Sequence, residues 1–153
     1  VVSPIANYTT TVSTERTLVE VQKMLAKAGA RRVLAEYDDD GEIAGLSFQV
    51  EVGGNLIGFR LPANTEGVAR ALEAQRVSTS YLRPEHVRRV AWRIIRDWLR
   101  AQFALIEAQQ ATLAQVMLPY AITPTGRTLA EEVEERGAHR LLALPSSDEE
   151  ARS

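Results

Sequence analysis

The chain of 153 residues contains no cysteine. This absence excludes disulfides and thiolate metal sites, and it fits a reducing compartment. No run of 18 apolar residues occurs either, so we expect no membrane-spanning helix and no membrane partner. Lysine is nearly absent, with two lysines against 16 arginines, a bias compatible with a thermophilic source. Together these absences favour a cytoplasmic protein.

Recognisable catalytic and metal-binding motifs are missing as well. The two histidines, His86 and His139, are far apart in the sequence and lack the acidic neighbours of a zinc site. Without cysteine, and without a Ser/His/Asp arrangement, the chain offers no nucleophile. The acidic run at 38–40 precedes Gly41 and an alternating segment, which indicates a hairpin turn and not a calcium loop. We therefore expect a non-catalytic protein without metal or cofactor.

The patterning predicts an α+β fold. The expected elements are a strand at 8–12, a helix between Ser13 and Gly29, strands at 31–37, 42–52 and 56–61, a helix of about a dozen residues capped by Asn64 or Thr65, a long helix at 84–110 and a short helix at 128–136. The order is therefore β-α-β-β-β-α-α-α. Strands precede helices, so a small antiparallel β-meander should pack against the long amphipathic helix. We expect one domain at 1–140 and a flexible acidic tail at 141–153.

The long helix carries the main candidate site, an arginine stripe. The stripe consists of Arg89, Arg93, Arg96 and Arg100. Their i, i+4, i+7, i+11 spacing places all four on one helical face. Trp92 and Phe103 border that face and are candidates for stacking on unpaired bases, while Trp98 is expected in the core. The stretch 60–100 holds nine arginines against four acids, so a local patch for phosphate groups is possible despite a net charge of −2.

A second basic group could extend this surface. It consists of Lys23, Lys27, Arg31, Arg32 and Arg60. Tyr37 on a predicted strand is a further candidate for base stacking. The alternative interpretation of this group is an ordinary solvated helix and strand surface.

Two other functions remain open for the same residues. The stripe could pair with acids of its own chain or of a partner, such as those at 131–135, and the broad apolar face of the long helix could mediate a dimer or higher homo-oligomer. The chain could also be a small regulator that binds a host protein, although no segment specifies such a target.

Three segments resemble a known group of proteins. They are 7–50, IGFRLPA at 57–63 and RVAWRIIRDWLRAQFALIEAQQATLAQVMLPYAITPTGRTL at 89–129. The chain from about 7 to 135 resembles a family of small, mostly uncharacterised bacteriophage and mobile-element proteins. This resemblance implies a role near viral DNA replication or recombination, in the cytoplasm of a bacterial host, and it supplies no catalytic residues. The combined expectation is a viral or mobile-element protein that binds single-stranded DNA with little sequence preference.

Overall fold

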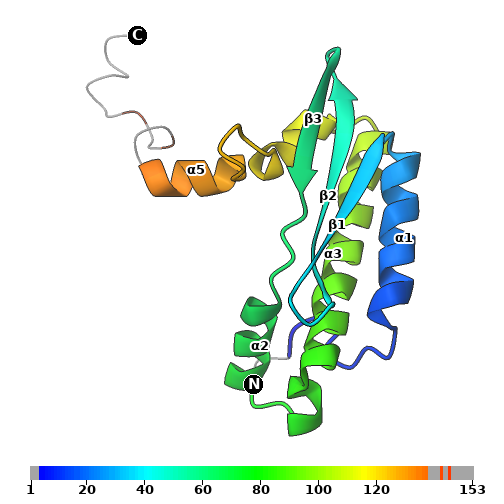
Figure 1. Ribbon diagram of the computed structural model, residues 1–153, viewed down its shortest axis with the longest axis vertical. Helices are drawn as coiled ribbons and strands as arrows, with labels where there is room; N and C mark the ends of the chain where they lie inside the picture. Colours follow the sequence, from blue (N-terminus) through cyan, green and yellow to red (C-terminus); the bar gives the residue numbers. More distant parts are fainter. Residues whose placement is uncertain (1–3, 138–141, 143–144, 146–153) are drawn as a thin grey trace.

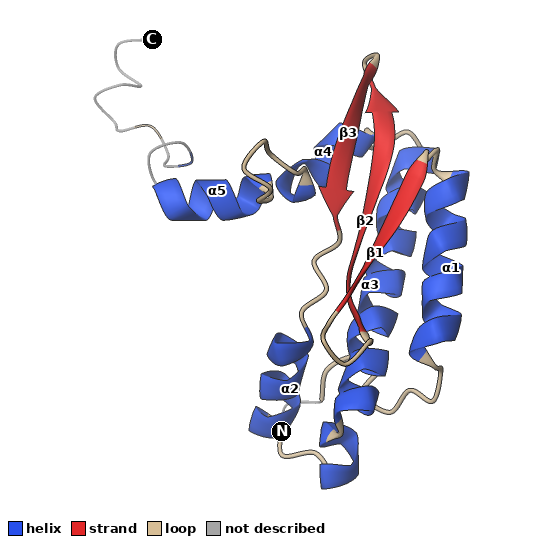
Figure 2. Cartoon of the chain, in the orientation of Figure 1, coloured by secondary structure: helices blue, strands red, loops and turns tan. Residues whose placement is uncertain are grey.

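The computed structural model describes residues 4–137, 142 and 145. Within that part of the chain, a three-stranded antiparallel sheet packs on a layer of helices, which confirms the predicted α+β fold. Figure 1 shows helices α1 and α3 side by side against the sheet, and Figure 2 shows that α2 and α5 lie outside this pair. The tail expected at 141–153 and His139 fall outside the described residues, except for 142 and 145.

Helix α1 (Thr14–Lys27) begins where the sequence places its cap. The Ser13 hydroxyl accepts a hydrogen bond from the backbone N–H of Arg16, which satisfies one of the donors that a helix start leaves free. Gly29 follows the helix with a φ of 98°, a left-handed conformation that glycine adopts without steric cost. The chain then reverses directly into the sheet.

The sheet is a meander of β1 (Arg32–Tyr37), β2 (Ile43–Val52) and β3 (Asn55–Arg60), in the order β1-β2-β3. The predicted hairpin turn joins β1 to β2, and one carboxylate oxygen of Asp38 accepts hydrogen bonds from the N–H groups of Asp40 and Glu42. Such an Asp-centred turn needs no metal to hold its shape.

The core forms between one face of the sheet and the long helix α3 (Pro84–Glu107). Alternate residues of β2 point inward, so Phe48 is buried opposite Phe59 of β3 and the two rings stack with centroids 5.4 Å apart. From α3, Trp92 and Leu99 are fully buried against them. Each such side chain contributes about 1.5–3 kcal/mol through burial. This packing fixes α3 beneath the sheet.

The remaining helices surround this core. Helix α2 (Thr65–Ala74), capped by Asn64, packs beside the first half of α3. After α3 the chain forms the short helix α4 (Leu113–Met117) and a 3-10 turn. It then forms helix α5 (Leu129–Arg136), which extends away from the sheet (Figure 1). The predicted long helix therefore ends at 107 and not near 110, and α4 was not predicted.

The first predicted strand, 8–12, is wrong. The β-branched run favours a strand, but tertiary contacts fix this segment as a turn and a loop. Asn7 has a φ of 65°, and the carbonyl of Tyr8 accepts a 2.6 Å hydrogen bond from His86 Nε2. The Tyr8 ring also packs edge-on against Tyr81 at 5.5 Å. The contact with this segment buries His86, although the residue lies in the first turn of α3.

Helix α3 buries its apolar face within its own chain. Along it, Val87, Val90, Ala91, Ile95 and Leu99 are all buried against the sheet, α1 or α2. The broad apolar face that would have supported self-association through this helix is therefore largely covered inside one molecule.

Candidate functional site

The arginine stripe faces α1 and is largely used to hold α1 in place. Glu20 of α1 accepts hydrogen bonds from Arg93 at 3.1 Å and from Arg96 at 2.9 Å. Both arginine side chains are largely buried, with 17% and 21% of their surface exposed. The stripe does pair with acids of its own chain, but these acids lie on α1 and on α3 itself and not in the acidic helix α5.

A second carboxylate extends this network. Asp97 accepts a 2.9 Å hydrogen bond from Arg96 and another of 2.9 Å from the side-chain amide of Asn7. Desolvation raises the pKa of both Glu20 and Asp97, but their hydrogen bonds and the charges of Arg93 and Arg96 outweigh it and leave each pKa below its ordinary value. Both acids are therefore ionised at neutral pH and compensate the arginines.

Arg89 lies outside any exposed patch. It is 3.7 Å from Glu85 and donates a hydrogen bond of 3.3 Å to His86 Nδ1. Its side chain is 28% exposed, and its Nε atom is buried without a partner in the described structure. This arginine supports the start of α3 and does not present a phosphate site.

The aromatic assignments are partly reversed. Trp92 has no exposed surface, so it is not available to stack on a base. Trp98, expected in the core, is partly buried at its margin, where it packs against the core and edge-on against Tyr120 with centroids 5.2 Å apart. Both tryptophans border the same apolar face, and the position of α1 and the sheet decides which one is enclosed. Phe103 keeps 8% of its surface exposed and faces a groove.

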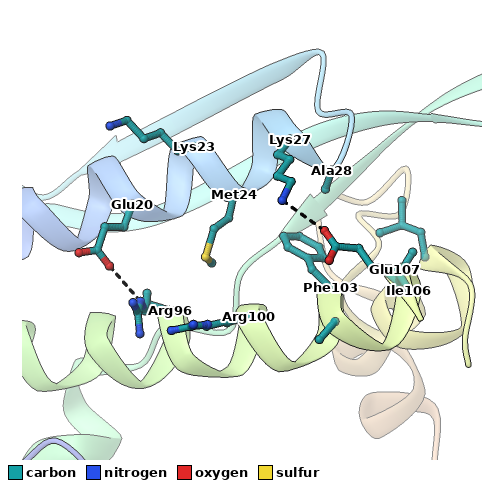
Figure 3. A pocket seen from close by; sticks show the side chains of 12 residues that line it. Glu20, Lys23, Met24, Lys27, Ala28, Arg96, Arg100, Phe103, Ile106 and Glu107 are labelled. Carbon is teal, nitrogen blue, oxygen red and sulfur yellow. Dashed lines mark hydrogen bonds and ion pairs between the residues drawn. The ribbon is translucent and has the colours of Figure 1, made fainter. Parts of the chain in front are cut away.

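That groove lies between the second halves of α1 and α3. Its volume is about 740 Å³. Its floor is apolar and its margins are charged. It is lined by Glu20, Lys23, Met24, Lys27, Ala28, Arg96, Arg100, Phe103, Ala104, Ile106, Glu107 and Leu113. Figure 3 shows Met24 pointing into the gap and Lys27 reaching across it toward Glu107, at 3.6 Å.

The groove unites residues from both predicted basic groups. Arg96, Arg100 and Phe103 come from the stripe and its border, and Lys23 and Lys27 come from the second group. Met24 and Ile106 were not predicted as site residues. The only sequence signal for Met24 was its place between two lysines, which is equally typical of an ordinary amphipathic helix.

The other members of the second basic group lie elsewhere. Arg31 is exposed and 3.7 Å from Glu51, Arg32 is exposed on β1, and Arg60 donates a hydrogen bond to the carbonyl of Gly126. Tyr37 is 66% exposed but does not line the groove. The structure therefore does not gather these four residues into one site.

Within residues 4–137, 142 and 145, no helix is long and apolar enough to cross a membrane. The same residues contain no group of three or more potential metal-ligating side chains. Comparison of the chain with protein-family models, with curated proteins and with solved structures found no match.

Proposed function

We propose that this protein binds single-stranded nucleic acid, DNA in preference to RNA, in the groove between α1 and α3, without catalysing a reaction. One observation carries the proposal: two basic segments that are distant in sequence meet around one apolar floor. A groove of this kind matches the two parts of an unpaired nucleotide strand, which are an anionic backbone and flat apolar bases.

The charges at the groove favour an anionic ligand. Four cations line it against the carboxylates of Glu20 and Glu107, which gives a local net charge of +2. In the described part of the chain, Lys23 and Arg100 have no ion-pair partner, so they are free to contact phosphate groups. With two to four phosphate contacts, the logarithm of the affinity should fall with the logarithm of salt concentration with a slope of roughly −1.5 to −3.

The floor favours unpaired bases. Met24, Phe103 and Ile106 offer apolar contact but few hydrogen-bonding groups, so they should accept any base. A volume of about 740 Å³ suits a ligand the size of a small molecule, which corresponds to a short stretch of nucleotides and not to a duplex. Binding should therefore prefer single strands and tolerate different sequences.

The resemblance to bacteriophage and mobile-element proteins supports the biological setting of this proposal. We propose a role in viral or mobile-element DNA replication or recombination within the bacterial cytoplasm. Fluorescence anisotropy of a labelled oligo-dT strand, compared with the same sequence as a duplex, tests the ligand. Salt-sensitive binding that prefers the single strand is expected, and no binding at about 50 mM salt would refute the proposal.

A pair of double variants tests the surface. Lys23→Glu with Arg100→Glu reverses the two unpaired cations of the groove, and affinity should fall at least about tenfold. The matched control, Arg70→Glu with Arg83→Glu, makes the same change of charge at two exposed positions remote from the groove. Equal losses in the two variants would mean that overall charge, and not the groove, determines binding.

A further inference from the structure

The two edges of the sheet differ. Residues that follow α4 cover part of the β3 edge, since the N–H of Ile122 donates a 2.8 Å hydrogen bond to the carbonyl of Gly58 and Ala121 bridges to Phe59. Strand β1 pairs only with β2, and in the described structure no segment lies along its other side. Figure 1 shows β1 as the outermost strand on the side of α1. Its outward backbone groups are therefore open to another strand.

Strand β1 is also poorly covered on its faces. Five of its six residues are exposed, including Leu34 at 52% and Tyr37 at 66%. An open edge that carries exposed apolar residues is a ready site for strand pairing, which natural proteins usually protect. This strand lacks the proline that would prevent such pairing.

The side chains of β1 indicate which strand fits. Val33 and Ala35 pair with the buried residues Phe48 and Leu46, so they lie on the sheet face that packs on the helices, where Val33 is partly buried and Ala35 is exposed at the edge. By alternation, Arg32, Leu34 and Glu36 point to the opposite face. This outer row is therefore a cation, an apolar residue and an anion at equal spacing. Neither charged side chain has an ion-pair partner in the described part of the chain.

We propose that β1 pairs antiparallel with β1 of a second copy of this chain, about a two-fold axis at Leu34. In this register Leu34 lies opposite its own symmetry mate, Arg32 lies opposite the partner's Glu36, and Glu36 lies opposite the partner's Arg32. Directly opposed charges of opposite sign stabilise an antiparallel pair, while like charges destabilise it. The axis is perpendicular to the sheet, so the two copies form one six-stranded sheet with both helical layers on the same side.

The symmetry gives a direct test by charge exchange, with mass measured by analytical ultracentrifugation. The wild type should form a dimer. Arg32→Glu places two pairs of like charges across the axis, and Glu36→Arg does the same with the opposite sign. Each single variant should therefore dissociate at least about tenfold more readily than the wild type. An equimolar mixture of the two variants restores both attractive pairs and should dimerise again.

Two results would overturn the proposal. One is a wild type that stays monomeric at high concentration, and the other is a dimer that the single charge reversals do not weaken. Both positions are exposed, so the variants should keep the wild-type circular dichroism spectrum and unfolding midpoint. The β1 residues do not line the groove between α1 and α3. Oligonucleotide binding by each monomeric variant therefore reports on the proposed function separately from dimer formation.

Discussion

Replacing Glu20 by glutamine should weaken the fold and strengthen ligand binding at the same time. The carboxylate of Glu20 accepts hydrogen bonds from Arg93 and Arg96 and so connects α1 to α3. Glutamine keeps an acceptor oxygen but removes the charge. Measuring the stability of this variant and its oligonucleotide affinity therefore distinguishes arginines that stabilise the fold from arginines that contact a ligand.

The expected loss of stability follows from the exposure of the three side chains. Exposed ion pairs contribute about 0–1 kcal/mol, and hydrogen bonds to charged groups contribute about 1.5–3 kcal/mol. Glu20 is 30% exposed and its two partners are 17% and 21% exposed. We therefore expect a loss of about 1–2 kcal/mol in the free energy of unfolding, which corresponds to a fall in Tm of roughly 2–8 °C for a chain of this size.

The loss should depend on pH in a defined direction. The pKa of Glu20 is lowered in the folded state from its ordinary value of 4.5, so the charged form favours folding. Its contribution is present above the unfolded pKa and is lost as pH falls through the folded pKa. Urea unfolding of wild type and Glu20→Gln should therefore differ most at neutral pH, and the difference should narrow below about pH 4.5.

Binding should change in the opposite direction. Without the Glu20 charge, the local net charge of the groove rises from +2 to +3, and Asp97 alone remains to compensate the charge of Arg96. Oligonucleotide affinity should increase several-fold at low salt, with a steeper salt dependence. The matched control is Glu73→Gln, which removes an acid from the exposed surface of α2. If both variants lost the same stability at neutral pH, the role assigned to Glu20 would be wrong.

Three further changes test the contacts that hold the fold together. Trp92→Ala should cost about 3–5 kcal/mol by urea unfolding because the side chain is fully buried. In a separate Trp98→Phe variant, which keeps Trp92 as its single tryptophan, oligonucleotide should not quench the fluorescence. His86→Ala should cost about 1–2 kcal/mol, and proteolysis near residue 8 should accelerate, because a buried hydrogen bond to the N-terminal segment is lost. Ser13→Ala should cost about 1 kcal/mol in thermal unfolding because it removes the cap of α1. Its control is Ser78→Ala, because Ser78 precedes the short 3-10 helix Thr79–Leu82 without a side-chain capping hydrogen bond, and this change should alter stability by less than about 0.5 kcal/mol.

Local signals predicted most of the fold because the chemistry that sets each element lies within a few residues. Alternation in β2, the Asp38 turn, the Asn64 cap and Pro84 at the start of α3 all occur where the sequence places them. The failure at 8–12 has the opposite cause. That segment is held by a hydrogen bond between Tyr8 and His86, which are 78 residues apart in the sequence. No local pattern encodes such a contact.

The candidate site was predicted only in part, because the contacts that shape it join residues far apart in the sequence. Periodicity correctly placed the four stripe arginines on one face of α3, but it could not state what covers that face. Glu20, whose acidic side chain occupies it, is 76 residues from Arg96. Likewise, the sequence could not decide between Trp92 and Trp98, because the side from which α1 approaches α3 is a property of the assembled core.

The arginine stripe divides along α3 into a part that stabilises the fold and a part that lines the proposed binding groove. Arg93 and Arg96 are compensated by Glu20, and Arg89 is held by Glu85 and His86, so these three guanidinium groups mainly stabilise the position of α1 and the start of α3. Arg100, one turn beyond Arg96, is exposed and lines the groove. Removing the Arg100 side chain should therefore lower oligonucleotide affinity without a measurable change in the free energy of unfolding. Removing the Arg93 side chain should lower the free energy of unfolding and leave the affinity unchanged. A stripe that acted as one phosphate-binding surface would show the same response at both positions.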